Sequence, residues 1–248
     1  MKETDTYVEM RPPAALRGSI ACLWVRRAAG ETVRIIPDAC VDLVWSSGAG
    51  AVLAGPDTGP SLSPTRPGQA IAGVRFLPGA GGSALGLPLD ELSDRRVALG
   101  DLGLDPDRRL SGDLDPWDAL ALLAGAASRL AGAVSPDRAV QQAALRLLDP
   151  RQRVESLAGD LGLSERQLRR RCRAGVGYGP KTLQRVLRLR RFLGAGAADL
   201  GRAALDAGYS DQAHLTRECR RLTGLSPAAL RAANAPARPA ARARAGCS

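Results

Sequence analysis

The sequence predicts an α+β N-terminal domain followed by an all-α domain of two helix-turn-helix units joined by a linker helix. Three features support this prediction: short apolar segments broken by Gly and Pro, later apolar residues at helical spacing, and a change of charge between the two parts. Residues 1–150 contain 15 Lys and Arg and 18 Asp and Glu, a net charge of −3. Residues 151–248 contain 20 Lys and Arg and 7 Asp and Glu, a net charge of +13.

The N-terminal domain, predicted to cover 1–149, begins with candidate strands. Four short apolar segments are bounded by turn residues, as in a small sheet or barrel: 20–25, 33–36, 41–45 and 70–76. Three later segments have helical spacing: 82–86, 116–131 and 136–148. Pro150 ends the last of these helices, because proline cannot continue the helical hydrogen-bond ladder.

The first helix-turn-helix unit follows Pro150. Four apolar residues form one stripe on a short helix: Val154, Leu157, Ala158 and Leu161. Gly162 ends that helix, and Ser164 with Gln167 then forms a capping box that starts a second helix. This helix turns Leu168 and Cys172 inward and a polar set outward: Arg166, Gln167, Arg169, Arg170 and Arg173.

The second unit repeats this arrangement after the linker. Leu200, Ala204 and Ala207 lie on its first helix, Gly208 forms the turn, and Ser210 or Asp211 caps the second helix. The outward residues of that helix are Gln212, His214, Thr216 and Arg217. Arg can read guanine and Gln can read adenine in the major groove, which makes both outward sets candidate DNA contacts.

The linker helix runs over 181–192, with one apolar side and arginines on the other. A helix of about 14 residues spans about 21 Å. The two recognition helices could then lie about 34 Å apart and enter successive major grooves. Of the 20 basic residues beyond 150 only Lys181 is not arginine, which favours double-stranded DNA as the partner.

At these residues the chain resembles the AraC/XylS family of bacterial transcription regulators. The resemblance covers about residues 150–233, through the segments 157–181 and 207–227. It implies a sequence-specific DNA-binding regulator whose outward residues contact bases or phosphates, with RNA polymerase as a further candidate partner and a cytoplasmic, nucleoid-associated location. The chain departs from the family at Cys172 and Cys219, where Phe is usual.

The segments 37–44 and 73–79 more loosely resemble an uncharacterised domain found in front of such units. That resemblance carries no known ligand, and by analogy with the AraC/XylS family this domain is expected to sense a small-molecule effector or to form a homodimer. The Ala-, Pro- and Arg-rich end, 234–248, is expected to be a disordered basic tail.

We expect no enzyme, cofactor or metal site and no membrane association. His214 is the only histidine, the five cysteines form no C-x-x-C pair, and the N-terminus lacks an apolar signal region. Two alternatives stay open: a fusion of a DNA-alkyl-repair methyltransferase with a regulator, for which Cys22 and Cys40 are the only cysteines before residue 150, and a module that binds nucleic acid without sequence preference.

Four features of the N-terminal domain also admit two interpretations. Cys22 and Cys40 could sense thiol chemistry, but core packing is favoured. Asp38 and Asp42 could be paired carboxylates, but turn and surface positions are favoured. The glycines at 79–82 could bind an anion, although they lack the P-loop ending. Large side chains could line a ligand pocket or fill the core: Trp24, Trp45 and Phe76.

Overall fold

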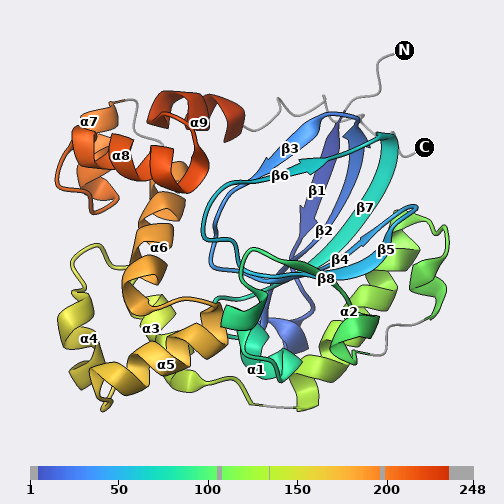
Figure 1. Ribbon diagram of the computed structural model, residues 1–248, viewed down its shortest axis with the longest axis horizontal. Helices are drawn as coiled ribbons and strands as arrows, with labels where there is room; N and C mark the ends of the chain where they lie inside the picture. The colour runs from blue at the N-terminus through green and yellow to red at the C-terminus, as the bar shows by residue number, and fades with distance from the viewer. Residues whose placement is uncertain (1–4, 105–107, 134, 196–198, 235–248) are drawn as a thin grey trace, which may run out of the picture.

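The computed structural model describes residues 5–104, 108–133, 135–195 and 199–234, and it contains two hydrophobic cores (Figure 1). The first core belongs to a sheet-rich part and the second to a helical part. The tail from residue 235, which is expected to be disordered, lies outside the described residues.

The sheet-rich part is built on a six-stranded antiparallel sheet with strand order β1-β2-β7-β4-β5-β8. Its strands are β1 (Thr6–Met10), β2 (Ile20–Ala29), β4 (Asp42–Ser46), β5 (Gly50–Ala54), β7 (Pro67–Phe76) and β8 (Arg96–Ala98). A separate hairpin pairs β3 (Thr32–Ile35) with β6 (Ser61–Pro64). The four predicted strands are confirmed as β2, β3, β4 and β7, whereas the sequence did not indicate the others, which are 3 to 5 residues long.

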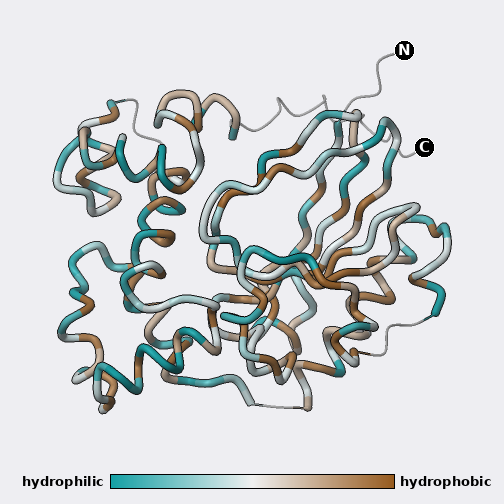
Figure 2. Tube along the Cα trace, viewed as in Figure 1, coloured by the Kyte–Doolittle hydropathy of each residue, from teal (hydrophilic) through white to brown (hydrophobic). Residues whose placement is uncertain are grey.

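One long helix, α2 (Pro116–Ala133), packs against β2, β4 and β7 on one face of the sheet. Figure 2 shows hydrophobic positions gathered where the strands meet this helix. Trp45 and Phe76 have no exposed surface in this core, and Trp24 is 9% exposed with its ring over Gly73. The interpretation as core residues is therefore confirmed for Trp45 and Phe76, whereas Trp24 is buried but belongs to neither of the two cores.

The helical part contains α4 (Val154–Asp160), α5 (Glu165–Val176), α6 (Pro180–Gly194), α7 (Leu200–Asp206), α8 (Gln212–Thr223) and α9 (Pro227–Asn234). In Figure 1, α6 runs between the α4–α5 unit and the α7–α8 unit, as expected for the linker. The sequence pattern did not indicate α9. Helix α3 (Arg138–Arg146) precedes Pro150, yet it buries Val140 and Ala143 in the second core.

The two parts meet where α5 packs against α1 (Gly81–Leu85) and the short 3-10 helix η2 (Leu89–Leu92). A Cβ atom on Gly82 would lie 2.5 Å from the backbone oxygen of Ala174, so only glycine allows this approach of α1 to α5. The glycines at 79–82 therefore serve packing, and α1, with 5 residues, is too short to form an anion site.

Candidate nucleic-acid interface

The first helix-turn-helix unit forms as the sequence predicts. Gly162 adopts a left-handed φ of 66° between α4 and α5. Ser164 Oγ accepts a hydrogen bond from Gln167 N at 3.2 Å, and Gln167 Oε1 accepts one from Ser164 N at 2.9 Å. This capping box satisfies the free backbone N–H groups at the start of α5, the candidate recognition helix.

Helix α5 separates a buried side from a basic side. Leu168 and Cys172 are buried, whereas the predicted contact residues are all exposed: Arg166, Gln167, Arg169, Arg170 and Arg173. Within the described part of the chain, none of these four arginines forms an ion pair. The carboxamide oxygen of Gln167 is already used by the cap, which leaves the arginines as the groups free to meet an anionic partner.

The second unit has the same geometry, with Asp211 as the cap. Its Oδ1 atom accepts a hydrogen bond from His214 N at 2.6 Å. This backbone hydrogen bond lowers the pKa of the Asp211 carboxyl below its usual value, so the charged form is favoured at the positive end of α8. The alternative cap, Ser210, instead contributes its hydroxyl to Asp211 and His214.

The predicted contacts of the second unit divide into two kinds. Gln212 and Arg217 are exposed, and their side chains have no partner among the described residues. His214 Nδ1 lies 3.3 Å from Ser210 N, and its ring packs edge-on against Tyr209. Thr216 Oγ1 donates to Gln212 O at 2.8 Å. The end of α8 also exposes Arg220 and Arg221, which the sequence pattern did not single out.

The arginines of the linker helix do not form a solvated face. Arg185 donates two hydrogen bonds to the Glu218 carboxylate of α8, from Nε to Oε2 and from Nη2 to Oε1, the second at 3.2 Å. Arg191 Nη1 donates to Ala207 O at 3.1 Å, and Arg190 Nη1 donates to Asp38 O of the N-terminal part at 3.0 Å. Their spacing in the sequence did not indicate these partners, because a basic helix face looks the same whether it meets protein, DNA or water.

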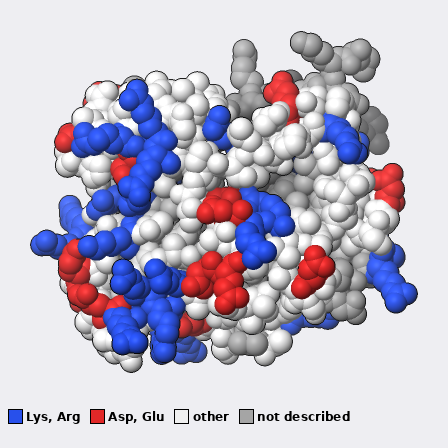
Figure 3. Space-filling model, viewed as in Figure 1, with Lys and Arg blue, Asp and Glu red and all other residues white. Residues whose placement is uncertain are grey.

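Basic side chains gather over both units on the face drawn in Figure 3. They lie over α8 at the upper left and over α5 at the lower left, in the view of Figure 1. Both recognition helices therefore contribute positive charge to this face, as binding to phosphates requires.

The N-terminal part also contacts the carboxyl end of each recognition helix. Ser93 Oγ donates to Gly177 O after α5 at 3.0 Å, and Arg34 Nη1 donates to Thr223 O of α8 at 3.1 Å. Gly177 has a φ of 90°, and a Cβ atom there would lie 2.3 Å from Pro56 Cγ. Both units are thus held against the sheet-rich part.

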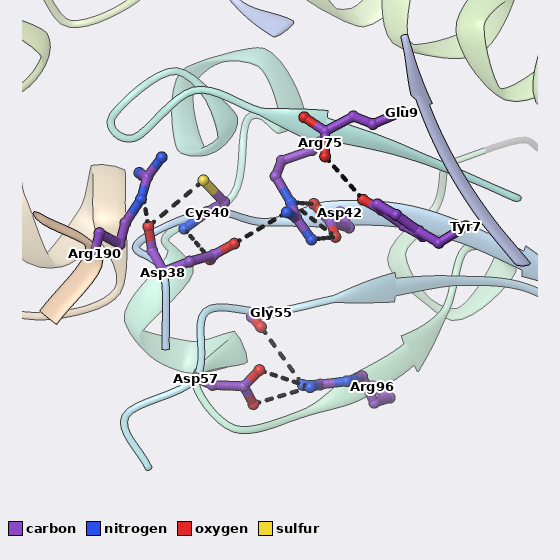
Figure 4. Close-up of polar contacts among 10 residues, drawn as sticks. All are labelled: Tyr7, Glu9, Asp38, Cys40, Asp42, Gly55, Asp57, Arg75, Arg96 and Arg190. Atoms are coloured by element: carbon purple, nitrogen blue, oxygen red, sulfur yellow. Dashed lines mark hydrogen bonds and ion pairs between the residues drawn. The ribbon is translucent and has the colours of Figure 1, made fainter. Parts of the chain in front are cut away.

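A partly buried ion-pair cluster includes Asp38, whose backbone oxygen accepts the hydrogen bond from Arg190 (Figure 4). Arg75 Nη2 lies 2.9 Å from Asp42 Oδ2, and Arg75 Nη1 lies 3.4 Å from Asp38 Oδ2. Burial raises the pKa of Asp42 to about 6, although Arg75 opposes the shift. Asp38 holds the predicted turn position, since its Oδ1 accepts from Cys40 N, but the surface position predicted for Asp42 is wrong.

The described thiols are inside the protein and not in a reactive site, and two of them, Cys172 and Cys219, belong to the second core. Cys22, Cys40, Cys172 and Cys219 are buried, and burial raises the pKa of Cys22 to about 12 and that of Cys219 to about 11. In the described ranges, no group of three or more His, Cys, Asp or Glu side chains could hold a metal ion. Nothing here supports the methyltransferase alternative.

No single helix of the described residues is long and apolar enough to cross a membrane; α2 and α3 reach that length only together, across a bend of 112°.

Two family models match the sequence. Residues 157–233 match a helix-turn-helix domain, and residues 8–98 match a domain of unknown function, DUF6597. The first match confirms the resemblance carried by the two units, and the second confirms an uncharacterised domain in front of them. No curated protein matches the chain.

The fold is similar to solved structures of ToxT from Vibrio cholerae. One, from O395, is 11% identical over 86% of this chain and 97% of that chain, with a TM-score of 0.48. Another, bound to (E)-4-(8-methylnaphthalen-1-yl)but-3-enoic acid, is 12% identical over 84% of this chain and 97% of that chain, with a TM-score of 0.47.

Proposed function

We propose that this chain is a DNA-binding transcription regulator of the AraC type, whose helix-turn-helix domain at residues 157–233 reads two successive major grooves with α5 and α8. The supporting observation is the repeated geometry. Each unit has a capped helix with a buried side and an exposed side, on which the predicted contact arginines form no ion pair among the described residues.

In this proposal the exposed residues of α5 contact bases and phosphates: Arg166, Gln167, Arg169, Arg170 and Arg173. Gln212, His214, Thr216 and Arg217 do so from α8. The four arginines of this α5 set and Arg217 of α8 are candidates for base contacts, because a free guanidinium can bind guanine through two hydrogen bonds. Arg170 and Arg217 serve to test one helix each. His214 and Thr216 contribute less, since their polar atoms already bond within the chain.

We also infer that the N-terminal part regulates this reading, through a small-molecule effector or a second copy of the chain. Its contacts with both recognition helices, at Gly177 and Thr223, support this role. The described residues also form an open hollow of about 760 Å³ at one end of the sheet, lined by Arg66, Gln69, Ser111 and Asp113 among others.

The proposal is tested by selecting DNA from random duplexes with the full chain and measuring affinity at several salt concentrations. Arg170→Ala and Arg217→Ala should each weaken binding by about 5- to 150-fold if they contact bases, or reduce the salt slope by about one if they contact phosphates. Arg202→Ala is the control, because Arg202 is exposed on α7 and pairs with Asp206.

Selection of no preferred sequence would favour binding without sequence preference. Binding that is unchanged by both substitutions would contradict the assignment of α5 and α8 as the reading helices. A ligand that binds the N-terminal part would raise the midpoint of thermal unfolding, which tests the effector.

A further inference from the structure

Three arginines of α6 are directed to the second helix-turn-helix unit. Arg185, Arg188 and Arg191 are spaced three residues apart, so they share one side of the helix. Arg185 contacts α8, Arg191 contacts the carbonyl at the end of α7, and Arg188 Nε lies 3.4 Å from the place of a Cβ atom on Gly208. This side of α6 forms a polar seam with the second unit.

The strongest contact in the seam is the pair of Arg185 and Glu218. Both Nε and Nη2 of Arg185 bind the carboxylate, and the two side chains are 23% and 14% exposed. A two-pronged contact fixes the direction of both side chains as well as their distance. Glu218 directly follows Arg217, a candidate base contact, so the pair acts on the reading part of α8.

Elsewhere the seam has few acceptors. Among the described residues, three polar atoms are buried there without a hydrogen-bond partner: Arg188 Nε, Arg191 Nη2 and Tyr209 Oη. Burial lowers the pKa of Arg191, although the charge of Asp149 opposes the shift. Glu218 is the carboxylate that binds this side of α6 directly, and it holds α8 in this orientation.

Both units pack against α6 through one apolar core, which includes Leu168 of α5 and Leu215 of α8. Their ion pairs to α6 differ: Lys181 Nζ lies 3.9 Å from Glu155 Oε1 of the first unit, and both side chains are exposed. The pair of Arg185 and Glu218 is two-pronged and largely buried. Loss of a polar contact in the seam would therefore shift α8 more than α5.

We propose that Arg185 and Glu218 are positioning residues that set the orientation of α8 relative to α5, and with it the spacing of the two half-sites that the protein prefers. This inference rests on the proposed reading of two grooves. Because one turn of B-DNA takes about 10 base pairs over about 34 Å, two added base pairs turn a half-site by about 70° and move it by about 7 Å. When Arg185 and Glu218 fix α8 on α6, the second recognition helix cannot follow that change. When the pair is lost, α8 can move to follow it.

The experiment uses the full chain and a selected duplex that carries both half-sites, together with duplexes lengthened or shortened by two base pairs between them. The wild type should bind the altered duplexes at least about tenfold more weakly, since losing a half-site costs at least as much as mismatched base pairs. Glu218→Ala and Arg185→Ala should reduce this ratio to about threefold or less, and the exchanged pair Arg185→Glu with Glu218→Arg should restore much of it.

The control is the exposed ion pair of α7, changed by Arg202→Ala with Asp206→Ala, which should leave the ratio unchanged. Affinity that falls equally at every spacing in both seam variants would overturn the proposal, because it indicates a loss of stability alone. If Glu218→Ala does not fold, Glu218→Gln decides by the same ratio. A wild type without any preferred spacing would contradict the reading of two grooves itself.

Discussion

Gly82→Ala should destabilise the protein, although alanine favours helices more than glycine does. Gly82 lies in α1, where it faces the end of α5. A Cβ atom would stand 2.5 Å from Ala174 O and 2.9 Å from Gly175 Cα, and neither backbone atom can move without moving the helix. The added methyl group therefore separates α1 from α5 at the junction of the two parts.

Overpacking of this kind costs about 1 to 3 kcal/mol. For a chain of this size, that loss corresponds to a fall of about 2 to 12 °C in the midpoint of thermal unfolding. Urea denaturation followed by circular dichroism would measure the free energy, and calorimetry would measure the midpoint.

Gly125→Ala is the matched control, because Gly125 lies inside α2 and its nearest neighbour would be the flexible end of Arg129 at 3.7 Å. There the same substitution should stabilise the protein by about 1 kcal/mol, from helix propensity alone. A change of the free energy of unfolding in the same direction in both variants, or no measurable effect of Gly82→Ala, would contradict the role of Gly82 in the contact of α1 with α5.

Three further predictions concern a helix cap, a carboxyl group and the buried thiols. Ser164→Ala removes the capping box and should lower the free energy of unfolding by about 1 kcal/mol in urea, whereas Ser156→Ala should change it less. Since the folded pKa of Asp42, about 6, exceeds its unfolded value, the folded state binds the proton more tightly. The wild type should therefore gain stability relative to Asp42→Asn as the pH falls from 7 through 6, and parallel pH profiles would contradict this. In a Cys247→Ser variant, iodoacetamide should label the four buried cysteines only after unfolding, which mass spectrometry would detect.

The helix-turn-helix units could be predicted because their signals are local. Gly162 with Ser164 and Gln167 specifies a turn and a helix start within six residues, and the apolar spacing on either side specifies the packed faces. Only the choice between Ser210 and Asp211 as a cap required the structure, since both side chains can accept the same backbone hydrogen bonds.

Some features of the N-terminal part could not be predicted, because they depend on contacts between residues that are far apart in the sequence. Asp42 lies opposite Arg75 only because β4 pairs with β7 in one register. A shift of one residue would have placed Asp42 on the other face, away from this partner. Gly82 is similar, because its requirement comes from α5, which lies far along the chain.

The net charge of residues 151–248 does not by itself identify the side chains of the proposed DNA interface. Three of the four arginines of α6 have protein partners: Arg185 binds Glu218, Arg190 donates to Asp38 O, and Arg191 donates to Ala207 O. Arg188 Nε is buried in the seam without a hydrogen-bond partner among the described residues. The excess of positive charge beyond residue 150 therefore has two uses. The predicted contact arginines of α5 and α8 form no ion pair in the described part of the chain, whereas Arg185 and Arg191 join the second unit to the linker and Arg190 joins the linker to the sheet-rich part.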